Sequence, residues 1–366
     1  MKIQSIQLDD YRNYRSLYLD GFEDLNVVTG RNAIGKTNLL ESIYLCSVGK
    51  SNRNVKDKEL IRWGGTSANV KITVSKKYRN HSVVVNIDAL GKKRILVDGA
   101  GILKLASLLG TINTVYFSPD EMRLIKESPS DRRRFIDISL CQHNKKYLSA
   151  LSKYNDVLEQ RNKLLKEDFS KKDILSTLEI WDGQFASYAA IVISERKKFV
   201  KRLNELAKEK CDFITDGAEK LSLEYESDSD SQTIEEIEND VLSALNKNKE
   251  KETELRYTLA GPHRDDLKIA CNGIDLRKFG SQGQQRTATL SVKLAEAELL
   301  KERTGEAPIV LLDDVLSELD AKRTKKLLEA LDGFQAFISC TEWENDVKAK
   351  VIKIEEIINK SEIASQ

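Results

Sequence analysis

The 366-residue chain lacks the features that mark several classes of protein. No apolar run approaches a membrane span, because the longest weakly polar stretch, Phe185–Ile193, is far too short. The N-terminal residues have no apolar segment of the kind found in signal peptides. The cysteines are Cys46, Cys141, Cys211, Cys271 and Cys340. Their odd number and the lack of a C-x-x-C pair argue against a disulfide framework or a zinc site, so we expect reduced, buried thiols in a cytoplasmic protein with no membrane association.

An excess of charge of one sign is missing as well. The chain has 59 basic and 58 acidic side chains, which give a net charge of +1. A globally basic surface is therefore excluded, and any anionic partner must be bound by local patches. The length and the 40% content of hydrophobic residues allow a large core, in one domain with an insertion or in two domains.

The pattern of apolar residues predicts an α/β domain split by a helical insertion. Strands and one helix are predicted in the first third, at Ile3–Leu8, Leu25–Thr29, Val70–Val74, Ser82–Ile87 and Ile95–Val97, with the helix from Thr37 to about Ser47. Helical spacing dominates from Pro129 to about Cys211. The polar segment Glu226–Glu252 is interpreted as a mobile loop around one exposed helix.

The last third returns to α/β signals. They predict strands at Leu267–Cys271, Pro308–Asp314 and Phe334–Cys340, and helices at Gly283–Arg303 and from about Ala321 to Leu331. The order of strands and helices predicts an α/β fold with a helical lobe inserted in the chain. We therefore predict an N-terminal α/β part over residues 1–120, a helical arm over 121–254 and a C-terminal α/β part over 255–366.

A phosphate-binding loop is the most specific motif. "GRNAIGKT" (Gly30–Thr37) matches G-x-x-x-x-G-K-[ST], follows a β-branched strand and opens a helix, as the motif requires. Its glycines let backbone N–H groups point at phosphate oxygens, while Lys36 reaches the β- and γ-phosphates and the Thr37 hydroxyl ligates Mg²⁺. The residues predicted to bind the nucleotide are Gly30, Arg31, Asn32, Ala33, Ile34, Gly35, Lys36, Thr37 and Asn38.

Two carboxylates follow a second buried strand, in "IVLLDD". Asp313 emerges at the carboxyl end of this strand, where α/β sheets place their ligands, and can hold Mg²⁺. Asp314 would face the attacking water as a polariser or general base.

The stretch "GSQGQQRT" (Gly280–Thr287) resembles a second phosphate grip at the start of a long helix. Ser281, Gly283 and Gln284 could bind phosphate there. Because the chain's own nucleotide already has the Gly30–Thr37 loop, we expect this second grip to bind the nucleotide of another copy. The prediction is a head-to-tail homodimer with ATP between the two chains.

The signature-like stretch, the "hhhhDD" strand and "SELD" (Ser317–Asp320) resemble ABC-type ATPases. More narrowly, the chain resembles the RecF family of DNA replication and repair ATPases over its full length. The stretches that support this resemblance occur in the family's order: "YRNY" (Tyr11–Tyr14), "FSPDE" (Phe117–Glu121), "SPSDRRRFID" (Ser128–Asp137), "LEQRNKLLK", "WDGQFA", "GPHRDD" (Gly261–Asp266) and "SQGQQRTATLSVKLAE".

The resemblance implies an ABC-type P-loop ATPase head with a mixed sheet, made by residues 1–120 and 255–366. This head is like those of Rad50 and SMC proteins but lacks their long coiled coil. It implies that Lys36 and Thr37 are the Walker A pair, Asp313 the Walker B aspartate and Ser281 the signature serine. The implied activity is slow, DNA-dependent ATP hydrolysis by a dimer that binds single-stranded, gapped or double-stranded DNA without sequence preference. RecO- and RecR-like partners, RecA loading and the SOS response are implied too.

Some residues depart from the pattern of ABC ATPases. Asp314 stands where a glutamate is usual, and a shorter carboxylate suits a slow switch. Thr341 is our candidate γ-phosphate sensor, in "SCT" where many such ATPases have a histidine. For His263 in "GPHRDD", a hydrogen-bonded polar turn is the interpretation we favour over a metal ligand or a base.

Basic clusters are the candidate DNA contacts. Arg132, Arg133 and Arg134 lie near the start of a helix, where the helix dipole disfavours cations, so an anion should compensate them. That anion is DNA phosphate or an acidic residue of the same fold, and the sequence leaves both open. Lys92 and Lys93, in a predicted hairpin tip, are weaker candidates. Without interleaved aromatics, contacts should be to the DNA backbone.

Two alternatives to an ATP-gated DNA clamp are the ATPase subunit of a membrane transporter and a structural protein that binds ATP but barely hydrolyses it. The helical insertion and the interval of over two hundred residues between the two phosphate grips fit transporter ATPases poorly, because those domains are compact.

Overall fold

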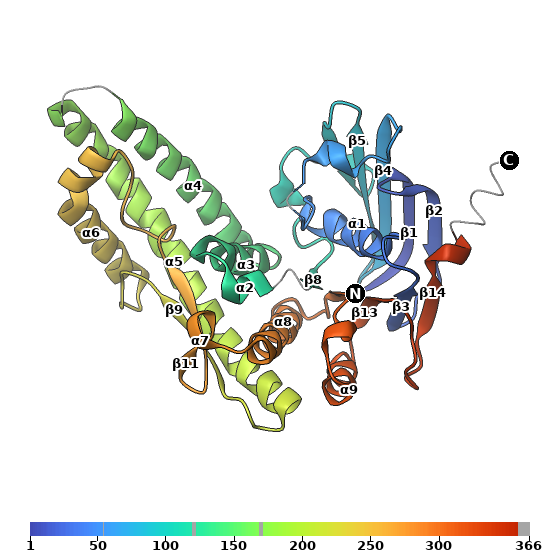
Figure 1. Cartoon of the computed structure of the whole chain (residues 1–366). Coiled ribbons are helices and arrows are strands. Elements are labelled where there is room, and N and C mark those ends of the chain that lie inside the picture. The colour runs from blue at the N-terminus through green and yellow to red at the C-terminus, as the bar shows by residue number, and fades with distance from the viewer. Residues whose placement is uncertain (54, 119–121, 168–170, 358–366) are drawn as a thin grey trace. The chain divides into compact units, whose positions relative to one another are not determined.

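The structure is a computed structural model of the whole chain, and it describes residues 1–53, 55–118, 122–167 and 171–357, with only the backbone for 171–176 (Figure 1). It comprises two compact units. The first contains Met1–Met122, Asp212–Ala218 and Thr289–Gln366, and the second contains Arg123–Cys211 and Glu219–Ala288. The predicted boundary at residues 120 and 121 and the last three residues of "FSPDE" lie outside the described residues.

The first unit contains a parallel sheet in the order β14-β3-β13-β12-β8. These strands are β3 (Leu25–Thr29), β8 (Thr114–Phe117), β12 (Ile309–Asp313), β13 (Gln335–Cys340) and β14 (Lys350–Lys353). All five residues of β12 are buried, because a central parallel strand is covered on both faces and therefore takes an unbroken apolar run.

The second sheet of this unit is antiparallel, in the order β2-β1-β4-β5-β6-β7. Its strands are β1 (Lys2–Tyr11), β2 (Tyr14–Asp20), β4 (Ser67–Ser75), β5 (Asn80–Asp88), β6 (Lys93–Val97) and β7 (Ala100–Gly101). Burial alternates along β4 and β5, as expected for a sheet with only one covered face. Helix α1 (Lys36–Val48) contacts strands of both sheets and shares one core with them. Helix α9 (Ala321–Ala330) joins a further core beside β12 and β13.

The second unit is mainly helical, with α2 (Arg123–Lys126), α3 (Pro129–Cys141), α4 (Lys145–Lys166), most of α5 (Lys171–Thr215) and α6 (Ile234–Leu255). Asn144 at the start of α4 donates to Glu195, and Arg161 near its end donates to Asp182, so α4 and α5 run antiparallel (Figure 1). A small antiparallel sheet, β11-β10-β9, contains β9 (Leu221–Glu226), β10 (Asp266–Cys271) and β11 (Ile274–Asp275), and the short helix α7 (Leu276–Phe279) follows it. Helix α8 (Gln282–Thr304) begins in this unit and continues in the first.

The helix expected within Glu226–Glu252 is present, but the interpretation of this helix as exposed was wrong. Helix α6 occupies most of this segment and buries Ile237, Val241 and Leu245. These three residues recur every four positions, so they form an apolar stripe that the many charged neighbours obscured. Glu252 on the same helix pairs with Arg161 at 2.7 Å, with both side chains fully buried.

Most other strands and helices predicted from the sequence are confirmed, and all five cysteines are buried free thiols. Within the described residues, no helix is both long enough and apolar enough to cross a bilayer.

Candidate nucleotide site

The Gly30–Thr37 loop connects β3 to α1, as predicted. Gly30 and Gly35 have φ angles of 148° and 117°, which residues with side chains rarely adopt. A Cβ on Gly35 would also lie 2.5 Å from the Asn13 amide nitrogen, so only glycine fits there. The Lys36 ammonium is nearly buried and donates to the carbonyls of Gly30 at 2.5 Å and Arg31 at 3.2 Å. The loop thus has the backbone geometry that phosphate binding requires.

The turn between β1 and β2 braces this loop from one side. The Asn13 amide donates to the Ile34 carbonyl at 2.5 Å and accepts from the Asn38 amide at 2.8 Å. The buried Tyr14 hydroxyl donates to the Gly35 carbonyl at 2.9 Å. These residues belong to the "YRNY" stretch, which was used only as a family marker, and no sequence pattern indicated that they contact the loop.

The C-terminal part of the chain braces the other side. Glu355 accepts from the backbone N–H of Arg31 at 3.1 Å and from its guanidinium at 2.9 Å, and Arg31 lowers the pKa of this carboxyl group. The Gly30 N–H donates to the Thr341 carbonyl at 3.4 Å. Thr341 itself is exposed just beyond β13. Its predicted role as γ-phosphate sensor stays a prediction.

Asp313 is the centre of a buried polar cluster at the carboxyl end of β12. One of its oxygens accepts from the Thr37 hydroxyl at 2.9 Å and from the Ser339 hydroxyl at 2.7 Å. The other accepts from the Tyr116 hydroxyl at 2.8 Å. Burial and the Asp313 charge raise the pKa of Tyr116 well above its usual value, so this phenol remains a donor. The sequence placed Thr37 and Asp313 together but missed Tyr116 and Ser339, which lie on the flanking strands β8 and β13.

These donors fit a magnesium ion. Thr37 and Asp313 offer only oxygen ligands, which Mg²⁺ prefers. No group of three or more His, Cys, Asp or Glu side chains that could hold a metal occurs in the described part of the chain. A site with one carboxylate and one hydroxyl matches magnesium held jointly by a protein and its phosphate ligand.

Asp314 follows directly with a φ of 54°. The Asp314 N–H donates to the Ser339 hydroxyl at 2.9 Å, and Asp314 is exposed. The left-handed turn therefore directs the chain out of the buried strand. The proposed role of this carboxylate toward water remains a prediction.

Ser281 belongs to the second unit and begins α8. Its hydroxyl accepts from the Gln284 N–H at 3.3 Å, while the Gln284 side chain accepts from the Ser281 N–H at 3.0 Å. This reciprocal pair is a capping box, which satisfies two backbone donors of the helix start. Ser281 and Gln282 are exposed and Gly283 is half-buried, so the helix N-terminus is open to a ligand.

His263 is a hydrogen-bonded core residue, as favoured from the sequence. It contacts the Tyr154 hydroxyl at 2.6 Å and the Thr258 carbonyl at 3.2 Å. Burial lowers the pKa of its imidazole to about 4, so the ring is neutral near pH 7.

The arginine cluster on α3 separates into different roles. Arg132 forms a bidentate pair with Asp266, at 2.6 and 2.7 Å, and its side chain is 4% exposed. The acidic residue of the same fold is therefore the partner of Arg132, which decides between the two alternatives that the sequence left open. Arg133 donates to the Asp265 carbonyl at 2.6 Å, whereas Arg134 is exposed.

The hairpin lysines also differ from one another. Lys93 pairs with Asp57 at 2.8 Å, and only Lys92 has an exposed side chain. Arg134 and Lys92 are thus the predicted DNA contacts whose side chains reach solvent.

Comparison with known proteins gives a consistent result. Residues 2–359 match the model of the RecF/RecN/SMC N-terminal domain. The chain is 43% identical over 351 residues to the DNA replication and repair protein RecF of Lachnoclostridium phytofermentans, covering 96% of each chain. It is 42% identical over 352 residues to that of Clostridium kluyveri, again covering 96% of each.

Solved structures agree with these relatives. The structure resembles that of the recombination mediator protein RecF with ATP in the RecFOR pathway, with a TM-score of 0.88, 36% identity and 96% of each chain covered. An SMC head bound to the C-terminal winged-helix domain of ScpA shares the fold, with a TM-score of 0.54 and 14% identity over 93% of this chain and 90% of that one.

Proposed function

The chain belongs to the RecF family of DNA replication and repair proteins, and we propose that it is an ATP-dependent DNA-binding protein of recombinational repair. The observation that supports this most is the Lys36–Thr37–Asp313 arrangement, in a chain similar over 96% of its length to a RecF structure with ATP. The chain matches DNA repair proteins over nearly the full length of both chains. The alternative of a transporter ATPase subunit is therefore not favoured.

We propose that ATP binds along the Gly30–Thr37 loop. Lys36 would exchange the carbonyls of Gly30 and Arg31 for the β- and γ-phosphates, which are stronger acceptors for an ammonium group. Thr37 and Asp313 would hold Mg²⁺, whose charge offsets that of the phosphates. Asp314 would polarise the attacking water only weakly, because its carboxylate is short. Hydrolysis would then be slow, which suits an ATPase that acts as a switch.

A second copy would complete the site. The start of α8 is exposed, and Ser281, Gly283 and Gln284 would bind a phosphate group there in exchange for the capping bonds. We propose that ATP joins two chains head to tail, that the closed dimer binds DNA without reading its sequence, and that hydrolysis releases it. RecO- and RecR-like proteins would be its partners in RecA loading on gapped DNA and in the SOS response.

The test is sedimentation and DNA binding, each with and without ATP. We expect dimers and DNA binding only with ATP, and DNA affinity that falls steeply with salt. Ser281→Arg should retain ATP binding but remain monomeric, whereas Lys36→Ala should lose ATP binding. The control Ser243→Arg makes the same change on the exposed side of α6 and should dimerise normally. ATP-dependent dimerisation of Ser281→Arg would show that the signature assignment is wrong, and DNA affinity indifferent to ATP would refute the gating.

A further inference from the structure

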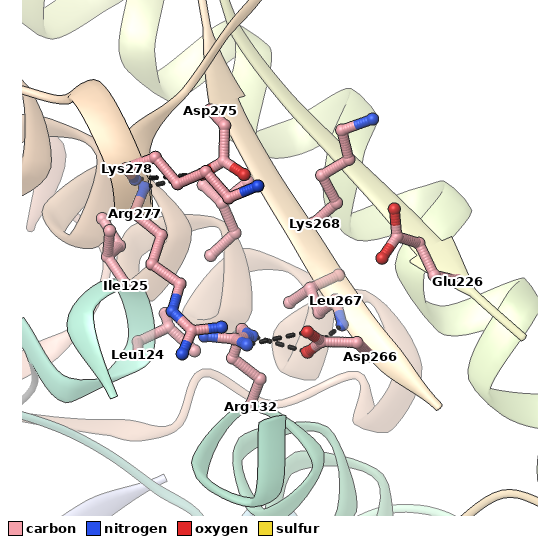
Figure 2. Close-up of a pocket in the computed structure, with 11 residues that line it drawn as sticks. Leu124, Ile125, Arg132, Glu226, Asp266, Leu267, Lys268, Asp275, Arg277 and Lys278 are labelled. Carbon is pink, nitrogen blue, oxygen red and sulfur yellow. Dashed lines mark hydrogen bonds and ion pairs between the residues drawn. The ribbon is translucent and has the colours of Figure 1, made fainter. Parts of the chain in front are cut away.

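The second unit contains a half-open cleft of about 340 Å³ whose lining includes none of the residues predicted to bind the nucleotide. Helices α2, α3 and α7 and the strand β10 contribute its walls (Figure 2). The volume lies in the range of protein sites that receive a small molecule or one or two side chains of a partner. Its lining combines buried aliphatic side chains with cationic and acidic groups.

A fixed arginine lies at one side of the cleft. The Arg132 guanidinium donates two hydrogen bonds to Asp266 and a third to the Glu127 carbonyl at 3.0 Å. A guanidinium has five N–H groups, so these bonds leave two for a ligand. Because the side chain is 4% exposed and held at three points, its position is set before any ligand arrives.

Arg277 approaches the same point from α7. Figure 2 shows its guanidinium directed into the cleft beside that of Arg132. The Asp275 side chain caps α7 by accepting from the N–H groups of Arg277 and Lys278, at 2.8 and 3.4 Å, which fixes the helix that presents them. Among the described residues, neither Arg277 nor Lys278 has a carboxylate within ion-pair distance.

Asp266 neutralises Arg132, whereas Arg277 lines the same cleft with no carboxylate of the described residues within ion-pair distance. An incoming anion would gain from both groups, and its attraction to the nearly buried Arg132 exceeds that at an open surface. A planar guanidinium matches a carboxylate with two parallel hydrogen bonds.

Apolar side chains form part of the walls. Leu124, Ile125 and Leu267 line the cleft next to the arginines, and little of their surface reaches solvent. An aliphatic or aromatic side chain that accompanies the anion would therefore gain mainly van der Waals contacts with them.

We propose that this cleft docks an acidic peptide segment of a partner protein, in which one Asp or Glu lies next to a large apolar residue. The carboxylate binds Arg277 and the spare N–H groups of Arg132, and the apolar side chain packs on Leu124 and Ile125. DNA fits the cleft less well, because Glu226 and Asp275 on its lining repel a continuous row of phosphates more than a single carboxylate.

Fluorescence anisotropy on the full-length protein tests the proposal. The probes are labelled hexapeptides with a central Asp-Leu or Glu-Phe pair, and matched peptides with Asn or Gln instead of the acid. We expect acidic peptides to bind at least about tenfold more tightly than amide peptides, since tenfold corresponds to about 1.4 kcal/mol, within the range of one charge-assisted hydrogen bond. Arg277→Glu should abolish this preference. Lys247→Glu, an exposed control on α6, should leave it unchanged within twofold.

Three outcomes would overturn the proposal. They are an absence of binding by every acidic peptide up to millimolar concentration, equal affinity for the amide peptides, or unchanged affinity in Arg277→Glu. Displacement of a bound peptide by a short DNA duplex that itself requires Arg277 would assign the cleft to nucleic acid instead. The measurement is made without ATP and repeated with Lys36→Ala, so its failure leaves the proposed ATPase function intact.

Discussion

Asn13 is predicted to control ATP affinity although it lies outside the phosphate-binding motif. Its side chain makes two hydrogen bonds, to Ile34 in the loop and to Asn38 in the following helix. Asn13→Ala removes both. Because both bonds are exposed, water replaces part of what is lost, and each is worth about 0.5–1 kcal/mol.

The loss of these bonds should weaken ATP binding, because the phosphate-binding loop becomes less ordered. Without the Asn13 brace, the unliganded loop samples conformations that must be ordered when the phosphates bind, which weakens binding. A loss of about 1–2 kcal/mol corresponds to roughly five- to thirtyfold weaker ATP binding. Without nucleotide, the free energy of unfolding should fall by at most about 1–2 kcal/mol, which is the sum of the two hydrogen bonds.

Isothermal titration calorimetry with ATP measures this directly. Asn246→Ala, an exposed change on α6, is the matched control and should bind ATP like the unmodified protein. Tyr14→Phe should also weaken ATP binding, because it removes the donor to the adjacent Gly35 carbonyl. If Asn13→Ala binds ATP within twofold of the unmodified protein, the turn between β1 and β2 does not order the loop and this reasoning is refuted.

Two further predictions concern the second unit. Arg132→Ala leaves Asp266 without its partner and should lower the free energy of unfolding by about 3 kcal/mol in urea titrations, whereas exposed Arg94→Ala should cost under about 0.5 kcal/mol. The second involves pH, because burial lowers the pKa of His263 to about 4 and raises that of Asp265 to about 6. His263 stabilises the fold above its unfolded pKa of about 6.5, and this contribution is lost as the pH falls toward 4. Asp265 acts oppositely, because protonation favours the fold as the pH falls from 6 to about 3.9. The two contributions largely cancel in the unmodified protein, so Asp265→Asn should lose stability markedly between pH 6.5 and 4, and a flat profile for that variant would contradict the lowered pKa of His263.

The sequence predicted the parts of the nucleotide site whose chemistry restricts both residue type and backbone. Gly30 and Gly35 need positive φ angles, and Asp313 needs the end of a buried strand, so each leaves a local pattern. The bracing residues leave none. Asn13 contacts a carbonyl 21 positions away, and Tyr116 contacts a carboxylate 197 positions away, through the tertiary fold alone.

Two features of the second unit show where local patterns were insufficient. The sequence left the partner of Arg132 open between DNA phosphate and an acidic residue of the fold, because Asp266 is 134 positions further along the chain. Helix α6 looked exposed because three buried apolar residues are few among its charged neighbours. The first case depends on tertiary packing alone, whereas the second has a local apolar stripe that the charged residues obscured.

The "GPHRDD" stretch shows how a family marker can be structural. The Pro262 carbonyl accepts from Arg196 on α5 at 2.7 Å, and His263 contacts Tyr154 on α4. Asp265 accepts from Tyr225 on β9 at 2.5 Å, which joins a third element to the same turn.

With Asp266 bound to α3, four of the five positions from 262 to 266 thus connect α3, α4, α5 and β9, mostly through charged or polar groups that are costly to leave unpaired once buried. This network restricts each of these residues for packing reasons and requires no catalytic role for His263. It also fixes Asp266, and through it Arg132, which is the rigid side of the cleft that we propose as a docking site. A substitution such as Tyr225→Phe should therefore lower stability by about 1 kcal/mol through the lost hydrogen bond to Asp265. Because the Arg132–Asp266 pair has its own bonds, the same variant should keep the acidic-peptide affinity of the cleft, and a parallel loss of peptide binding would show that the turn and the cleft are one cooperative unit.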